Sequence, residues 1–287
     1  MMNGGVMRSG QLIAAAGLGP PLVPFASLPA ASTIEGQVRR LAELPHVSLI
    51  ALGGIWLPFG GRQVLAKRTI NPVTVQSLTN VVAETIGPFP GGLVRAGMQL
   101  VFDAYCGSPG IGTGIRVYEA LIGDGWLVQS NATTSSTDSN AQIRGILDVL
   151  ADGNAIHKAA RGPNGSYDRG SALSTPIVDF SAAWSVPLRL TSTAETAVNI
   201  TSASWAAGIA TFVTSAVHTL AVGDKTVIAV VSPSGYNVAA GAIVLSVPTT
   251  TSFTVAIASD PGAYTSGGTS SRISNMISQS YVLELVG

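Results

Sequence analysis

The side chains that could carry chemistry are few and scattered. The three histidines, His46, His157 and His218, lie far apart, and none has a second metal ligand at a binding spacing. We interpret His218 as a polar residue at the end of a strand. The single cysteine, Cys106, ends the apolar stretch Met98–Tyr105, so it can form no intrachain disulfide and fits a small buried hydrophobe better than a nucleophile. These residues predict no metal, no cofactor and no covalent catalysis.

Two carboxylates facing each other across a groove could cleave a polysaccharide. The candidates are Asp148, Asp168 and Asp179, which lie in or near predicted loops or turns. Carboxylates at such spacings occur in any chain of this size, so the sequence favours a protein that is not an enzyme. The glycines of Gly110–Gly114 lack the third glycine and the following helix of a phosphate-binding loop, and they predict a turn between strands.

Aromatic side chains at loop tips can stack on the apolar face of a sugar. Tyr167, Tyr236 and Tyr264 each lie in a turn-rich segment and are candidate contacts for a surface ligand. The alternative for each is that the ring packs onto its own sheet. The tryptophans lie within apolar stretches and predict core or interface positions: Trp56, Trp126, Trp184 and Trp205.

The composition excludes several classes of protein. The 287 residues include 15 Lys+Arg and 15 Asp+Glu, so 10% are charged and the net charge is zero, whereas soluble proteins average about 25% charged residues. Such a chain has no electrostatic attraction for nucleic acid and is too hydrophobic to be disordered. The longest apolar stretch, Leu12–Ala31, contains four prolines, so we expect no membrane insertion. Its short, glycine-interrupted apolar run also argues against a cleaved signal peptide.

Short β segments dominate the chain from Arg62 onwards. In Leu93–Cys106, apolar residues alternate with polar ones at the period of a half-buried strand. Turn signals such as Asp152–Asn154 recur every ten residues or so, which is typical of a sandwich or barrel. The fold class predicted is therefore all-β, with a jelly-roll-like β-sandwich.

Residues 1–60 differ from the rest. They are apolar, rich in glycine and proline, and irregular, so we expect them to dock on another surface. Within them, Ser32–Leu44 predicts one short helix, and Leu49–Gly61 predicts a hairpin around Gly53–Gly54.

The C-terminal third predicts an insertion. Residues 201–271 contain four or five strand-like segments that are poor in charge and end in a Gly/Ser/Thr hinge. The terminal strand Tyr281–Val286 cannot be stable alone and should pair with the earlier sheet. The domain map is then an N-terminal segment over 1–60, a β-sandwich over 61–200 plus 272–287, and a small inserted module over 201–271.

Three segments resemble the opening of tail-fibre-like and other minor virion proteins of tailed bacteriophages. They are Phe25–Ser32 (FASLPAAS), Gly36–Leu44 (GQVRRLAEL) and Gly54–Ala66 (GIWLPFGGRQVLA). The stretch Ile209–Gly268 resembles the small Ig-like β modules of phage structural proteins. The resemblance implies an attachment segment, a β-sandwich whose last strand ends the chain, homotrimeric assembly, and a distal domain that faces the host.

The expected function is that of a structural virion protein, a tail or head fibre subunit assembled in the host cytoplasm. Its expected partners are copies of itself, other virion proteins contacted through residues 1–60, and a host surface glycan. Two alternatives stay open. One is a fibre-borne polysaccharide depolymerase that uses the carboxylates above, and the other is a bacterial carbohydrate-binding adhesin, which would require export.

Overall fold

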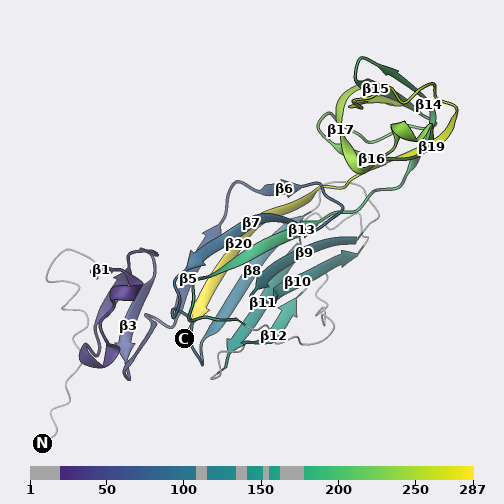
Figure 1. Cartoon of the computed structure of the whole chain (residues 1–287). Helices are drawn as coiled ribbons and strands as arrows, with labels where there is room; N and C mark the ends of the chain where they lie inside the picture. The colour runs from purple at the N-terminus through teal and green to yellow at the C-terminus, as the bar shows by residue number, and fades with distance from the viewer. Residues whose placement is uncertain (1–19, 108–114, 134–140, 151–154, 162–177) are drawn as a thin grey trace, which may run out of the picture.

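A computed structural model describes residues 20–107, 115–133, 141–150, 155–161 and 178–287 (Figure 1). These residues form an N-terminal sheet, a two-sheet sandwich and a closed barrel. The helical segments among them are short 3₁₀ turns, Phe25–Ser27, Ala31–Thr33 and Ser234–Tyr236, and none of the described helices is long and apolar enough to cross a membrane. The all-β prediction is confirmed.

The sandwich is a jelly roll. Its eight principal strands are, in chain order, β5 (Arg62–Arg68), β7 (Val81–Phe89), β8 (Gln99–Gly107), β9 (Ile115–Ile122), β10 (Gly125–Thr133), β11 (Ala141–Val149), β13 (Trp184–Thr191) and β20 (Met276–Val286). One sheet has the order β11-β8-β20-β5 and the other the order β10-β9-β13-β7, and all of these pairings are antiparallel. The first strand therefore pairs with the last, the second with the seventh, the third with the sixth and the fourth with the fifth, which is the double Greek key.

Two further strands extend the first of these sheets. β12 (Ala155–Arg161) pairs with β11, and β6 (Val73–Val75) pairs with the beginning of β20. The terminal strand β20 itself lies between β8 and β5, with Leu283 opposite both Phe102 and Ala66. The expected pairing of the terminal strand with the earlier sheet is confirmed.

The barrel lies in the chain between β13 and β20 and in space beyond one end of the jelly roll (Figure 1). Its strands are β14 (Val198–Ala206), β15 (Ile209–Thr214), β16 (Lys225–Ser232), β17 (Val238–Thr249), β18 (Ser252–Ala256) and β19 (Ser266–Arg272). They close in the order β14-β15-β18-β17-β16-β19, whereas the sequence predicted an Ig-like module of four or five strands. Of the hinge expected over Pro261–Ser271, the part from Ser266 onwards instead belongs to β19, because pairing with β14 and β16 closes the ring and leaves no free edge.

The N-terminal residues form a small sheet, β1-β2-β3-β4, and are therefore less irregular than expected. Its strands are β1 (Leu22–Val23), β2 (Val38–Leu41), β3 (Ser48–Leu52) and β4 (Ile55–Pro58). The hairpin around Gly53–Gly54 is confirmed, since both glycines have positive φ and Leu52 pairs with Ile55. The helix predicted over Ser32–Leu44 is wrong, because Gly36 adopts a positive φ and β2 pairs with β3.

The N-terminal sheet docks on the jelly roll of its own chain. The buried side chains of Leu41, Leu49 and Trp56 belong to the same hydrophobic cluster as the jelly-roll core. The backbone N–H of Ser48 also donates to Oε1 of Gln63 in β5, at 3.1 Å. The jelly roll of the same chain therefore supplies a surface on which this apolar N-terminal segment docks.

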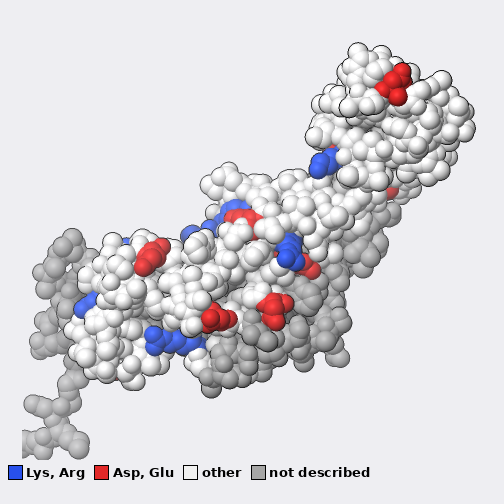
Figure 2. Space-filling view, in the orientation of Figure 1, with Lys and Arg blue, Asp and Glu red and all other residues white. Residues whose placement is uncertain are grey.

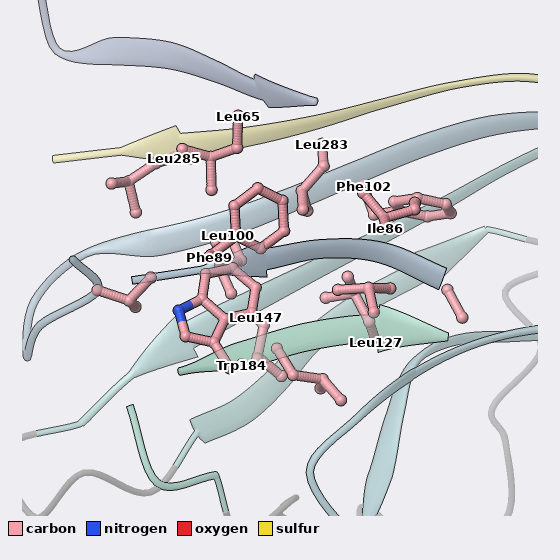
Figure 3. Close-up of a cluster of buried hydrophobic side chains, with 14 of the residues drawn as sticks. Leu65, Ile86, Phe89, Leu100, Phe102, Leu127, Leu147, Trp184, Leu283 and Leu285 are labelled. Carbon is pink, nitrogen blue, oxygen red and sulfur yellow. The ribbon is translucent and has the colours of Figure 1, made fainter. Parts of the chain in front are cut away.

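Side chains from both sheets fill the jelly-roll core. Figure 3 shows Leu65, Ile86, Phe89, Leu100, Phe102, Leu127, Leu147, Trp184, Leu283 and Leu285 in this cluster. The rings of Phe89 and Trp184 lie 4.5 Å apart, which joins β7 to β13. At Gly145 the two sheets approach so closely that a Cβ atom would overlap the carbonyl group of Leu127, which explains a glycine inside a strand.

The barrel has a separate core built around Phe212, which lies 5.4 Å from Phe253 and 5.7 Å from Tyr236 between ring centroids. Because the buried clusters of the barrel and the jelly roll are distinct, the two parts should unfold as separate units.

We expect Phe102→Ala to destabilise the jelly roll alone and Phe212→Ala to destabilise the barrel alone, each by about 3–5 kcal/mol. Both side chains are fully buried, so each substitution leaves a cavity in one core. Differential scanning calorimetry should show two transitions, of which each variant lowers one. Val82→Ala is the control, because Val82 is 50% exposed on β7 and its loss should change stability by less than about 0.5 kcal/mol. A single transition lowered equally by both core variants would contradict the two-unit interpretation.

Candidate functional site

The structure gives the candidate catalytic carboxylates local partners. Oδ1 of Asp148 accepts a hydrogen bond from Nε2 of Gln99 at 2.7 Å. Asp179 is exposed, and its Oδ1 accepts hydrogen bonds from the hydroxyl of Ser181 at 2.5 Å and from the Ser181 backbone N–H at 2.9 Å. These bonds stabilise the charged carboxylate and lower the pKa of Asp179. Asp168 lies outside the described residues, and no group of three or more metal-ligating side chains comes together within the described part.

Of the candidate sugar-contacting tyrosines, Tyr236 and Tyr264 form hydrogen bonds within the barrel. Tyr236 is only 1% exposed, and its hydroxyl donates to the carbonyl oxygen of Gly262 at 3.1 Å. Its assignment as a surface contact is wrong, because the ring packs against Phe212 inside the barrel. Tyr264 is half-buried, and its hydroxyl lies 3.0 Å from the carbonyl oxygen of Gly267. Tyr167 lies outside the described residues.

Among the other reactive side chains, Cys106 and His218 are buried, whereas His46 is exposed. Cys106 is 2% exposed, and burial raises the pKa of its thiol to about 12, so its interpretation as a small core residue is confirmed. His218 lies past the end of β15, which stops at Thr214, and is buried with its ring edge-on to Phe253 at 5.4 Å between ring centroids. Nε2 of His46 lies 3.0 Å from the carbonyl oxygen of Leu65. The side chain of His157 lies outside the described residues.

A polar cluster absent from the sequence-based prediction joins the two sheets of the jelly roll. Nη1 of Arg68 in β5 lies 2.6 Å from Oε2 of Glu84 in β7, and the hydroxyl of Tyr281 in β20 donates to the other Glu84 oxygen at 3.0 Å. Nη2 of Arg68 donates to the carbonyl oxygen of Ser278 at 2.9 Å. Burial and the Glu84 carboxylate raise the pKa of Tyr281 to about 12, so its hydroxyl stays a donor at neutral pH. No local pattern signals this cluster, since its members are far apart in the chain.

The outer face of the β11-β8-β20-β5 sheet carries opposite charges on neighbouring strands. Arg62 in β5 forms an ion pair with Glu284 in β20, and Nε of Arg144 in β11 lies 3.7 Å from Oδ1 of Asp103 in β8. Burial raises the pKa of Asp103 above its ordinary value, and this effect exceeds the opposing attraction of Arg144. These charges neutralise each other within the sheet, so the face offers no strong field to a charged partner.

The barrel wall is nearly free of charge. Residues 198–272 contain only Asp224, Lys225, Asp260 and Arg272 as charged residues, and Asp224 pairs with Arg272. Figure 2 shows few charged side chains on the visible face of the barrel. Several aliphatic side chains are instead exposed: Ile209, Val217, Val222, Val230, Ile243 and Leu245. Such a wall suits a neutral partner, either apolar or rich in hydroxyl groups, and disfavours a highly charged one.

No protein-family model, curated protein sequence or solved structure matches the chain. The charge-poor surface of the barrel, with its exposed aliphatic side chains, is a candidate for contact with another molecule.

Asp103→Asn should change the pH dependence of jelly-roll stability. The pKa of Asp103 in the folded chain lies above its ordinary value of 3.8, so the folded state binds the proton more tightly than the unfolded state. The contribution of Asp103 to the free energy of unfolding therefore falls as pH rises from below 3.8 through the raised pKa. Asparagine cannot ionise, so the stability of the variant relative to the original should increase across this interval and then level off.

Chemical denaturation at intervals from about pH 3 to pH 7 measures this difference. Asp260→Asn, on an exposed barrel loop, is the control and should leave the pH dependence of the jelly-roll transition unchanged. A relative stability of Asp103→Asn that falls as pH rises would contradict the raised pKa.

Proposed function

We propose that this chain is a structural subunit of a tailed-bacteriophage particle, namely a tail or head fibre protein that assembles as a homotrimer. One observation carries the proposal: the N-terminal sheet and the barrel lie at opposite ends of the jelly roll, in a row (Figure 1). A subunit of this shape can attach at one end and present a module at the other.

Two further features support this function. Jelly rolls recur in viral capsid and lectin domains, which is a likeness of fold and supports the class of function without specifying it. Zero net charge and exposed aliphatic side chains favour contact between copies, because no charge repulsion opposes it. The resemblance of the N-terminal segments to fibre-like virion proteins supports a three-copy assembly.

In this proposal the N-terminal sheet is the attachment module. Its buried apolar side chains belong to the hydrophobic cluster that includes the jelly-roll core, but Leu22, Ile55 and Phe59 are exposed. We assign contact with other virion proteins to these side chains. The barrel is then the distal module, and its neutral wall suits a host glycan better than a charged polymer.

The depolymerase alternative gains no support from the described residues. Asp148 and Asp179 each hold a local hydrogen-bond partner, which is an arrangement that positions backbone and side chains rather than a substrate. Adhesion without cleavage agrees better with this geometry, and it forms part of the fibre proposal.

Native mass spectrometry of the full chain should show a trimer of the 29.1 kDa subunit as the main species. The physical reason is that a neutral, charge-poor surface is stabilised by burial against identical copies. A spectrum dominated by the monomer at micromolar concentration would contradict the fibre proposal. Proteomics of purified phage particles should also detect the chain, and its absence from them would contradict the virion assignment.

Replacing Leu22, Ile55 and Phe59 together by serine should abolish incorporation into particles while the chain remains trimeric. The change removes exposed apolar contacts and leaves the shared core intact. The matched control replaces the exposed barrel residues Ile243 and Leu245 by serine, and it should still be incorporated. Equal incorporation of the N-terminal variant, measured by quantitative mass spectrometry of particles, would overturn the assignment of the attachment surface.

A further inference from the structure

The chain passes between the jelly roll and the barrel twice, and the two crossings are bonded to each other. The outgoing crossing runs from β13 to β14, and the returning crossing runs from β19 to β20. Ala194 and Ile273 form an antiparallel bridge, and the backbone N–H of Ser274 donates to the carbonyl oxygen of Thr193 at 3.0 Å. The connection is therefore a two-stranded ribbon rather than two independent linkers.

The guanidinium of Arg272 contacts carboxylates at the barrel end of this ribbon. Nε of Arg272 lies 2.9 Å from Oδ2 of Asp224, and its Nη2 donates to Oδ1 of Asp224 at 3.2 Å. Nη1 of Arg272 lies 3.8 Å from Oε1 of Glu195 on the outgoing crossing. Asp224 and Glu195 are each 8% exposed, so water screens this group little. The ribbon and the start of β16 are thus fixed to each other.

The side chain of Gln76, in the jelly roll, reaches this cluster. Gln76 directly follows β6, and its Nε2 lies 3.2 Å from Oδ1 of Asp224 and 3.3 Å from the carbonyl oxygen of Ile273. Its Oε1 accepts a hydrogen bond from the backbone N–H of Lys225 at 3.0 Å. The amide therefore uses its donor and acceptor groups on β16 and on the returning crossing.

We propose that Gln76 is the positioning residue that holds the barrel in one orientation relative to the jelly roll. A two-stranded ribbon alone bends and twists easily, because it has no third strand or covering layer to stiffen it. Gln76 ties a third segment of the jelly roll, the residue after β6, both to the ribbon at Ile273 and to the barrel at Asp224 and Lys225, and so turns a flexible joint into a rigid one. This inference concerns the joint alone and does not depend on the proposed function.

The chemistry of the amide makes the lock specific. Alanine would remove both its donor and its acceptor. Glutamate would keep the size but place a second carboxylate beside Asp224, where the amide now donates. Both substitutions should free the barrel to swing while the jelly roll and the barrel stay folded, since Gln76 is only half-buried and lies outside both hydrophobic clusters.

Pulsed electron–electron double resonance on the full chain tests the lock. Spin labels are placed on cysteines substituted for Thr85 in β7 and Ser204 in β14, which are both exposed. The native Cys106 stays unlabelled because it is buried. Labelled chains are diluted with unlabelled ones, so that distances within one copy dominate in an assembly.

We expect a narrow distance distribution for the original chain and a broadened, shifted one for Gln76→Ala and Gln76→Glu. Gln99→Ala is the matched control, since it removes a glutamine amide that bonds Asp148 within the jelly roll, and its distribution should stay narrow. Calorimetry of the same samples should show both folding units intact. Distributions for both Gln76 variants that superimpose on that of the original chain would overturn the proposal, and so would equal broadening by Gln99→Ala.

Discussion

The hydrogen bonding of the terminal strand on both of its edges is the constraint on which the rest of the structure depends. β20 pairs with β8 on one side and with β5 on the other, so the first sheet of the jelly roll cannot close until the end of the chain has returned from the barrel. The same strand end supports the N-terminal sheet, since the backbone N–H of Gly287 donates to the carbonyl oxygen of Gly61 at 3.0 Å and Gly287 lies against Pro58. Pairings across such long sequence separations are costly in loop entropy, and a large apolar core must offset that cost.

Several of the few charged side chains form ion pairs that join separate strands. Arg68 with Glu84 joins the two sheets, Arg272 with Asp224 fixes the joint to the barrel, and Arg62 with Glu284 spans β5 and β20. These pairs neutralise each other, and with only 10% charged residues the chain has a surface of low net charge, with charges sparsest on the barrel. A composition that would suit an isolated soluble protein poorly is therefore consistent with a subunit that buries its surface against neighbours.

The arrangement of the three parts fits the proposed role. The jelly roll carries the N-terminal sheet at one end and the barrel at the other, and each contact is made differently: a shared hydrophobic core on one side, a ribbon with a polar lock on the other. A shared core suits a permanent attachment. The polar contacts of Gln76 fix the orientation of the barrel relative to the jelly roll while burying little apolar surface. Several copies in one assembly would then present their barrels in a common orientation, as multivalent adhesion requires.

The sequence by itself determined the features that depend on neighbours along the chain. Period-two alternation predicted the strands, Gly53–Gly54 predicted the hairpin, and the apolar surroundings of Cys106 predicted its burial. Tertiary structure decided the rest, because the deciding partners are distant. The pairing of β2 with β3 overrode the helix expected over Ser32–Leu44, and ring closure made a strand of the Gly/Ser-rich β19. The burial of Tyr236 and the three-way bonding of Gln76 likewise arise only when segments remote in sequence meet, which no local pattern records.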